Sequence, residues 1–238
     1  MVEAWIARIL VLSVLLLLCF LVIQGGRFVW GRLTDTEETF QGAKVLEPKE
    51  REPGTKLVVL DAGHGGGDQG TSGGEVLEKD INLAVVKKLA ELLQDEETTV
   101  IFTREDDTKI GLEERAAFAN ENEADLFVSL HCNYCEDDAG VQGLECYYRE
   151  DSAEGEKLAN LVVQAVEEEE QIVNRGTRTA NFRVLCRTQM PAVLVEMGYL
   201  SNADERGKMA EEKYQEMVAG RIAEGVRRML EEEMQAKE

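Results

Sequence analysis

The sequence predicts an α/β fold: a single layered domain with a mostly parallel mixed sheet flanked by helices, preceded by an N-terminal transmembrane helix. Three observations lead to this prediction. From Lys56 onward, short apolar runs alternate with segments of helical periodicity, which is typical of a layered α/β domain. A chain of 238 residues is long enough for one sizeable domain with length to spare. Near its start, residues 9–26 carry no charged side chain.

This uncharged segment approaches the ~20 apolar residues that cross a bilayer core. No small-residue cleavage motif follows it, and a leucine precedes Cys19, which does not fit a lipoprotein signal. We therefore expect residues 1–26 to be an uncleaved membrane anchor, with a cleaved signal as the alternative. Residues 27–55 lack a sustained apolar period and contain Pro48 and Pro53, so we expect a linker or stalk.

The folded domain is expected at residues 56–238. Its strands should be short, apolar and bounded by polar or glycine-containing turns, and its helices should show apolar side chains on one face. The expected strands are 56–62, 98–103, 124–130, 143–148, 182–186 and 192–199. The expected helices are 78–94, 111–123, 152–170 and about 211–233.

The charge of the chain excludes one class of partner. The formal net charge is −21 at pH 7, and the phosphates of a nucleic acid would be repelled by such a protein. Two glutamate runs, 167–170 and 231–233, fall in predicted helices, where we expect them to form solvated faces.

The cysteines leave their pairing open. Cys19 lies in the apolar segment, and the other four allow three pairings: Cys132, Cys135, Cys146 and Cys186. The motif "HCNYC" contains one Cys-x-x-Cys, whereas a zinc ribbon needs two, so loop cysteines or a local disulfide are the expectation.

Both histidines of the chain lie where ligands collect in such folds. His64 stands in the glycine-rich stretch "LDAGHGGGDQG" after the first predicted strand, and His131 follows the strand 124–130. Ligands of open α/β sheets bind beyond the carboxyl ends of the strands. Glu78 opens the first helix just after the glycine loop, so its carboxylate can turn back toward the same edge. Two histidines and one carboxylate form a common ligand set for catalytic zinc.

Glu196 is a lone carboxylate within the otherwise apolar strand "AVLVEMGY". An unpaired buried charge is costly, so such a residue is usually paired, protonated or close to a cation. Next to a metal, this carboxylate would be suited to serve as a general base, with its pKa shifted by partial desolvation.

Each of these residues also has a purely structural interpretation. A strand-end histidine often only forms hydrogen bonds, Glu78 could stabilise the dipole of its helix, and Glu196 could face solvent. The joint occurrence of all four favours a metal site. The alternative of a phosphate loop is disfavoured because the glycine stretch lacks the G-K-[ST] ending and no lysine follows until Lys79. The glycines are instead expected to let a bulky substrate approach His64 and to supply positive φ angles.

Four separated motifs resemble one known family. "VVLDAGHGG", "LEKDINL", "ADLFVSLHCN" and "PAVLVEMGYLSN" occur in the order seen in the zinc-dependent N-acetylmuramoyl-L-alanine amidases of the amidase_3 type. The likeness extends from Lys56 to about Leu230 and includes "TREDD", "LEERAAFAN" and "GLECYY". The sequence departs from the family where Ala62 replaces a common proline, Cys132 a small residue and Tyr199 a phenylalanine.

The resemblance implies specific roles. It makes residues 56–238 a zinc amidase catalytic domain, with His64, Glu78 and His131 as zinc ligands and Glu196 as the catalytic glutamate. The implied reaction is hydrolysis of the amide between N-acetylmuramic acid and L-alanine in peptidoglycan, which removes the stem peptide. Asn133, two residues after His131, is expected to help orient the substrate.

The expected setting is the bacterial cell wall. The catalytic domain would lie outside the cytoplasm, held to the cell membrane by residues 1–26, or be secreted if that segment is cleaved. The single membrane segment and short length also resemble the germination-specific amidases of the spore cortex, and a regulatory protein partner remains open. Two alternatives are another zinc wall hydrolase, such as a deacetylase, and a catalytically silent domain that binds wall material. H-E-x-x-H is absent, which excludes one large peptidase class.

Overall fold

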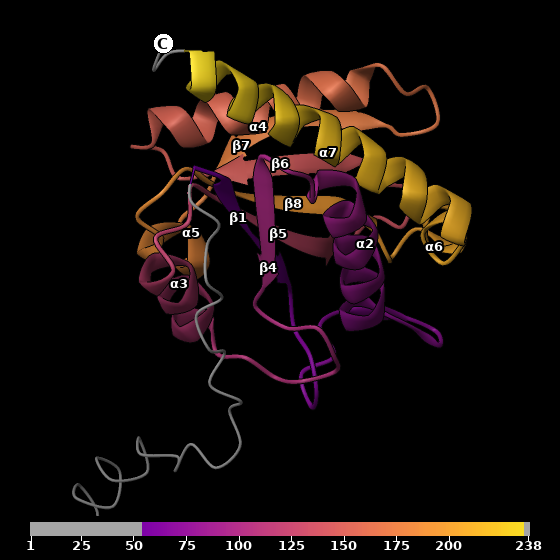
Figure 1. Ribbon diagram of the computed structural model, residues 1–238. Coiled ribbons are helices and arrows are strands. Elements are labelled where there is room, and N and C mark those ends of the chain that lie inside the picture. The colour runs from indigo at the N-terminus through magenta and orange to yellow at the C-terminus, as the bar shows by residue number, and fades with distance from the viewer. Residues whose placement is uncertain (1–53, 236–238) are drawn as a thin grey trace, which may run out of the picture. The chain divides into compact units, whose positions relative to one another are not determined.

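The computed structural model describes residues 54–235, which form an α/β domain (Figure 1). The anchor predicted at residues 1–26 and nearly all of the predicted stalk lie outside the described residues. Within residues 54–235, no helix is long and apolar enough to cross a membrane.

A six-stranded sheet forms the centre of the domain. Its strands, in spatial order, are β4 (Thr98–Phe102), β1 (Lys56–Ala62), β5 (Leu126–Asn133), β8 (Ala192–Tyr199), β6 (Leu144–Tyr148) and β7 (Asn174–Thr179). All neighbouring strands run parallel except β6 and β8, which are antiparallel. The predicted mostly parallel mixed sheet is therefore confirmed. A small hairpin of β2 (Ser72–Gly73) and β3 (Val76–Leu77) follows β1.

Helices cover the two faces of the sheet unequally. One face packs against α2 (Glu78–Leu93), α4 (Ala153–Glu167) and α7 (Glu212–Gln235), with α6 (Ala203–Met209) beside them. The other face carries α3 (Leu112–Glu121) and the short α5 (Arg183–Arg187) (Figure 1). The buried residues of this second core come from β1, β4, β5, β8, the two helices and Ala124 between α3 and β5, and Tyr147 of β6 packs against them while only partly buried.

Side-chain alternation places the polar residues of interest on that second face. Leu57 and Val59 of β1, Phe127 of β5 and Leu194 of β8 all belong to the core beneath α3 and α5. Because side chains alternate along a strand, residues two positions further along share their face. The same face thus receives four polar residues from the three strands: Asp61, Ser129, His131 and Glu196.

Several segments differ from the sequence-based expectation, among them α6 and the hairpin of β2 and β3, which were not predicted. Residues 182–186 were expected to be a strand, but the structure forms α5 there. The apolar run is short, and Val184 and Leu185 are both buried, a pattern that periodicity does not distinguish from a strand. Strand β7 was not predicted because its sequence, NRGTRT, contains no apolar residue. It lies at the edge of the sheet, where neither face needs to be buried.

The close approach of α7 to α4 depends on one glycine. A Cβ atom at Gly225 would lie 2.4 Å from Cα of Val162, a contact with backbone that cannot yield without a shift of the helices. Gly220, one and a half turns earlier in α7, has nothing within 4 Å of such an atom. The two positions therefore differ in packing within the same helix.

We predict opposite effects of alanine at these positions. Gly225→Ala should lower the free energy of unfolding by about 1–3 kcal/mol, because overpacking separates α7 from α4. Gly220→Ala should raise it by up to about 1 kcal/mol, because alanine favours the helix over the unfolded chain. Urea unfolding followed by circular dichroism measures both. If both substitutions changed the free energy of unfolding by the same amount, the close contact between Gly225 and Val162 would be contradicted.

Candidate metal centre

His64 sits on a loop whose backbone is left-handed. The residue itself has φ 63°, and Gly65, Gly66 and Gly70 also have positive φ. Only glycine adopts such angles without strain, so the predicted conformational role of these glycines is confirmed. His64 carries the strain of a non-glycine residue in this region, a feature that clusters at functional sites.

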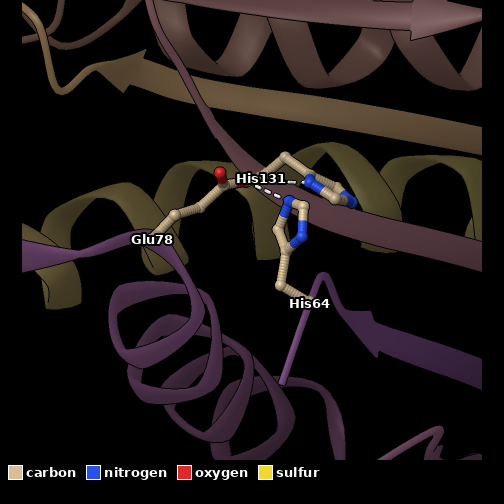
Figure 2. Close-up of side chains that lie close together, drawn as sticks. All are labelled: His64, Glu78 and His131. Atoms are coloured by element: carbon tan, nitrogen blue, oxygen red, sulfur yellow. Dashed lines mark hydrogen bonds and ion pairs between the residues drawn. The ribbon is translucent and has the colours of Figure 1, made fainter. Parts of the chain in front are cut away.

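Glu78 brings the two histidines together. His64 Nε2 lies 3.1 Å from Glu78 Oε1, and His131 Nδ1 lies 2.9 Å from the same oxygen (Figure 2). The two imidazole rings are nearly perpendicular, with centroids 4.9 Å apart. One ligand atom from each of the three residues lies within 4.8 Å of the others. The structure thus gathers the three residues that the sequence analysis selected as metal ligands.

Backbone donors hold the Glu78 carboxylate in place. The amide of Thr71 donates to Oε2 at 2.7 Å, and the amide of Cys132 donates to Oε1 at 3.1 Å. Burial alone would raise the pKa of Glu78, but the hydrogen bonds from His131 and His64 outweigh burial and hold that pKa far below its usual range. Glu78 is therefore an ionised, oriented carboxylate.

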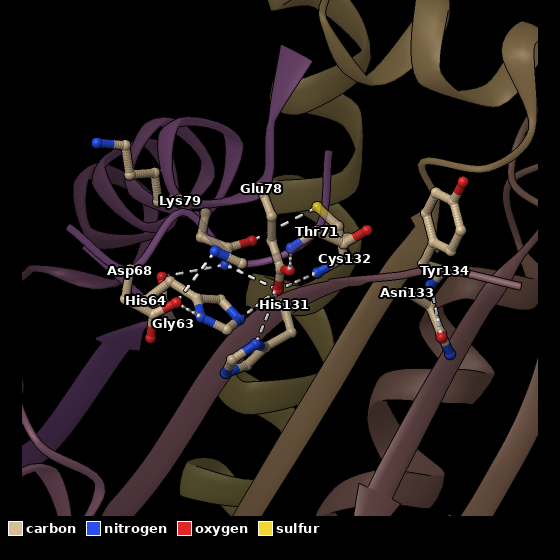
Figure 3. A network of polar contacts seen from close by, with 12 residues as sticks. Gly63, His64, Asp68, Thr71, Glu78, Lys79, His131, Cys132, Asn133 and Tyr134 are labelled. Carbon is tan, nitrogen blue, oxygen red and sulfur yellow. Dashed lines mark hydrogen bonds and ion pairs between the residues drawn. The ribbon is translucent and has the colours of Figure 1, made fainter. Parts of the chain in front are cut away.

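Asp68 supports His64 from the other side of the ring. Its Oδ1 lies 3.0 Å from His64 Nδ1, which leaves Nε2 directed at Glu78 (Figure 3). Burial would lower the pKa of His64, but hydrogen bonds with Glu78 and Asp68 raise it. A carboxylate on the far nitrogen of a histidine is a common way to orient a metal ligand. Asp68 was not predicted as part of the site, although its position four residues after His64 in the same loop is a signal for such a role.

Two glycines make room for the cluster itself. A Cβ atom at Gly63 would lie 2.2 Å from Cε1 of His131, and one at Gly70 would lie 2.4 Å from Oε2 of Glu78. From the sequence, the lack of side chains in this loop was expected to admit a bulky substrate. At these two positions the observed reason is the approach of His131 and Glu78.

Glu196 lies beside the cluster in the next strand. It is the register partner of His131 on β8, and its Oε2 is the one buried side-chain N or O atom in residues 54–235 without a hydrogen-bond partner. Burial raises the pKa of Glu196 to about 7; the nearby positive charge of His131 opposes this, and the negative charges of Glu78 and Glu145 add to it. A buried, unpartnered carboxyl group next to three converging ligands is suited to a cation or a reacting proton.

Asn133 occupies a different position. It ends β5, and its Oδ1 accepts a hydrogen bond from the amide of Tyr134 at 2.7 Å. Figure 3 shows its side chain apart from the histidines and Glu78. The structure does not join Asn133 to the cluster, and its substrate role stays a prediction.

The cysteines of the described region are all free. Cys132, expected in a loop, lies inside β5, and burial raises the pKa of its thiol well above the usual value. No disulfide forms among Cys132, Cys135, Cys146 and Cys186, so the local disulfide considered for the "HCNYC" motif is absent from residues 54–235.

The donor set fits zinc. Two imidazoles and one carboxylate are the ligands of a typical catalytic zinc site, which keeps a further position open. The unpartnered oxygen of Glu196 beside them adds an acceptor near that position. In a purely structural network, buried carboxylates and histidines all have hydrogen-bond partners. Here the Oε2 atom of Glu196 has none.

Two bacterial proteins are similar in sequence to most of this chain. YqiI of Bacillus subtilis (strain 168) is 39% identical over 187 residues, which cover 77% of this chain and 87% of that protein. LytH of Staphylococcus aureus, named a probable cell wall amidase, is 34% identical over 183 residues, and the match covers 75% of this chain and 60% of LytH.

Solved structures share the fold. The N-acetylmuramoyl-L-alanine amidase of Clostridium difficile 630 is 38% identical, with a TM-score of 0.72, and the match covers 75% of this chain and 98% of that one. The amidase CwlD of Clostridioides difficile, solved in complex with the GerS lipoprotein, is 31% identical, with a TM-score of 0.69, over 74% of this chain and 99% of that one.

The profile of the Amidase_3 family, described as N-acetylmuramoyl-L-alanine amidase, matches residues 58–228. This range contains the whole histidine–glutamate cluster and Glu196. The chain therefore belongs to the Amidase_3 family and is an N-acetylmuramoyl-L-alanine amidase.

Proposed function

We propose that this amidase is zinc-dependent and that His64, Glu78 and His131 hold the metal. The observation that carries the proposal is the convergence of one ligand atom from each residue within 4.8 Å. The bond cleaved is the amide between the lactyl group of N-acetylmuramic acid and the L-alanine of the stem peptide, which family membership supports. A zinc ion bound there would polarise the scissile carbonyl and lower the pKa of water.

Glu196 is assigned the proton transfers of the reaction. A carboxyl group with a pKa of about 7 is suited to accept and release protons near neutral pH. Glu196 takes a proton from the attacking water and later delivers it to the departing nitrogen of L-alanine. Its unpartnered Oε2 supports this assignment, because that oxygen is not already occupied by another donor.

Other residues orient the ligands. Asp68 holds the ring of His64, and the amides of Thr71 and Cys132 hold the carboxylate of Glu78. Such outer contacts fix ligand geometry and increase metal affinity. Asn133, at the end of β5, is proposed to contact the substrate at the rim of the site.

The location of the enzyme belongs to the same proposal. Residues 1–26 would anchor the chain in the cell membrane, with the catalytic domain outside the cytoplasm, or would be cleaved from a secreted form. CwlD, 31% identical, is solved with the GerS lipoprotein, and this supports a regulatory protein partner here as well. The setting we propose is remodelling of the cell wall or the spore cortex, the latter because the single N-terminal apolar segment and short length resemble the germination-specific amidases.

The glycine loop offers a direct test of the metal site. Gly63→Ala should reduce bound zinc at least 10-fold, because the new methyl group displaces the ring of His131. Gly67→Ala is the matched control: a Cβ atom there has nothing within 4 Å, so zinc content should stay unchanged. Zinc per protein after dialysis, measured by mass spectrometry, checks both. Full zinc loading of the Gly63→Ala protein would argue against these ligands.

The role of Glu196 is tested separately. Glu196→Gln keeps the shape of the side chain and removes its ability to take a proton, so turnover should fall about 10²–10⁴-fold while zinc content is retained. Mass spectrometry of digested peptidoglycan gives the rate and the bond cut. Free stem peptides support the amidase, whereas released acetate would indicate a deacetylase. Near-normal turnover by the variant would refute the assignment of Glu196.

A further inference from the structure

A second buried carboxylate lies one strand beyond Glu196. Glu145 on β6 is the register partner of Glu196 and is 2% exposed. It is on the face of the sheet that α3 and α5 cover only in part, because its neighbours Leu144 and Cys146 point into the opposite core. His131, Glu196 and Glu145 therefore form a row across three adjacent strands.

Two arginines of the edge strand and a tyrosine hold Glu145. Arg175 Nε donates to Oε1 at 2.5 Å, and Arg178 Nη2 lies 3.3 Å from the same oxygen. The hydroxyl of Tyr147 donates to Oε2 at 2.6 Å. Burial alone would raise the pKa of Glu145, but the hydrogen bonds from Arg175 and Tyr147 and the charges of both arginines lower it. Glu145 is therefore ionised.

The arginines are far more exposed than the carboxylate they contact. The side chain of Arg178 is 51% exposed and that of Arg175 is 31% exposed, against 2% for Glu145. The guanidinium of Arg175 also lies over the ring of Tyr199, with Cζ 5.5 Å from the centroid. Two guanidinium groups around one carboxylate leave a net charge of +1. The buried carboxylate of Glu145 thus orients two positively charged guanidinium groups that are partly exposed to solvent. This local positive charge lies on a chain whose net charge is −21.

The chemistry of peptidoglycan indicates which of its groups the two arginines could bind. In the bond to be cleaved, the lactyl carboxyl of muramic acid is already consumed as an amide, so the free carboxylates of peptidoglycan belong to the stem peptide. Arginine forms its strongest contacts with carboxylates, through paired N–H donors. Neighbouring strands are about 4.8 Å apart, so β7 lies about 10 Å from β8. About three residues of extended peptide span that distance.

We propose that Arg178, with Arg175, binds a carboxylate of the second or third residue of the stem peptide, and that Glu145 positions both guanidinium groups. This inference rests on the proposed function, because it requires the scissile bond to lie beside Glu196. It makes the enzyme selective for stem peptides whose carboxylates are free. Stem peptides in which the same carboxyl group is amidated would lose the contact.

The test uses Arg178→Gln in the full-length enzyme. Purified muropeptides are supplied with the carboxyl group free or amidated, at the second residue in one pair and at the third in another. With the free form, Arg178→Gln should lower kcat/KM about 10-fold or more, mainly through KM, since a hydrogen bond to a charged group is lost. With the form amidated at the contacted residue, it should change kcat/KM less than about 2-fold. The pair of muropeptides in which Arg178→Gln affects only the free form shows whether the arginine binds the carboxylate of the second or of the third residue.

Matched variants separate recognition from a structural role. Arg178→Lys should restore part of the preference, because it keeps the charge but not the fork of donors. Arg187→Gln removes an arginine of α5 with a similar exposed fraction, 56%, whose Nε lies 3.4 Å from Glu113, and it should leave the preference of the enzyme unchanged.

The outcomes distinguish the two proposals. Equal loss on free and amidated muropeptides, or no loss on either, would overturn carboxylate recognition while leaving the amidase intact. If the wild-type enzyme with zinc releases no stem peptide from any muropeptide, the proposed function fails and this inference falls with it.

Discussion

A buried ion pair between Asp61 and Arg115 is the interaction on which the site depends. Asp61 is completely buried at the end of β1, and Arg115 Nη1 donates to its Oδ1 at 2.6 Å. The hydroxyls of Thr103 and Ser129 donate to the same carboxylate. Burial alone would raise the pKa of Asp61, but the charge of Arg115 and the hydroxyl donors hold it below the usual range. Both oxygens of the Asp61 carboxylate therefore have hydrogen-bond partners. Without its partner, either buried charge would cost several kcal/mol of stability.

This ion pair matters because side chains, rather than strand pairing, supply hydrogen-bond donors to the carbonyls of residues 62–64. Arg115 donates to the carbonyls of Ala62 and His64, and Arg104 donates to those of Ala62 and Gly63. Buried carbonyl groups need such partners, since leaving one unpaired is costly. Arg104 also reaches the carbonyl of Lys79 at the start of α2. The same two guanidinium groups therefore fix the segment that carries His64 and connect it to the helix that carries Glu78.

The convergence of His64, Glu78 and His131 was predictable from the sequence because each residue is marked by the strand or helix beside it. His64 and His131 each stand near the carboxyl end of an apolar strand, and the geometry of parallel sheets brings such ends together. Glu78 opens a helix with clear periodicity. The contacts that orient these residues were not predictable in the same way. Arg104 and Arg115 read as ordinary charged residues in a polar loop and a helix, and their burial follows only from the tertiary fold.

Failures of prediction have a similar origin. The edge strand β7 contains polar residues throughout, so no apolar pattern marked it, yet it supplies Arg175 and Arg178. The short α5 carries two adjacent buried residues, which a strand would carry as well. In both segments, the tertiary contacts of the residues determine the secondary structure. These contacts cannot be inferred from a single sequence.

The arrangement of β6 gives two neighbouring glutamates different properties. β6 runs antiparallel to β8, and this pairing sets Glu145 opposite Glu196 on the same face of the sheet. Glu145 has two arginines and a tyrosine as partners and stays ionised, whereas Glu196 has an unpartnered oxygen and a pKa raised to about 7 by burial. The negative charge of Glu145 itself contributes to that rise. Partners that hold Glu145 ionised therefore help to raise the pKa of Glu196, so the proposed binding and catalytic groups are linked by one pair of adjacent strands.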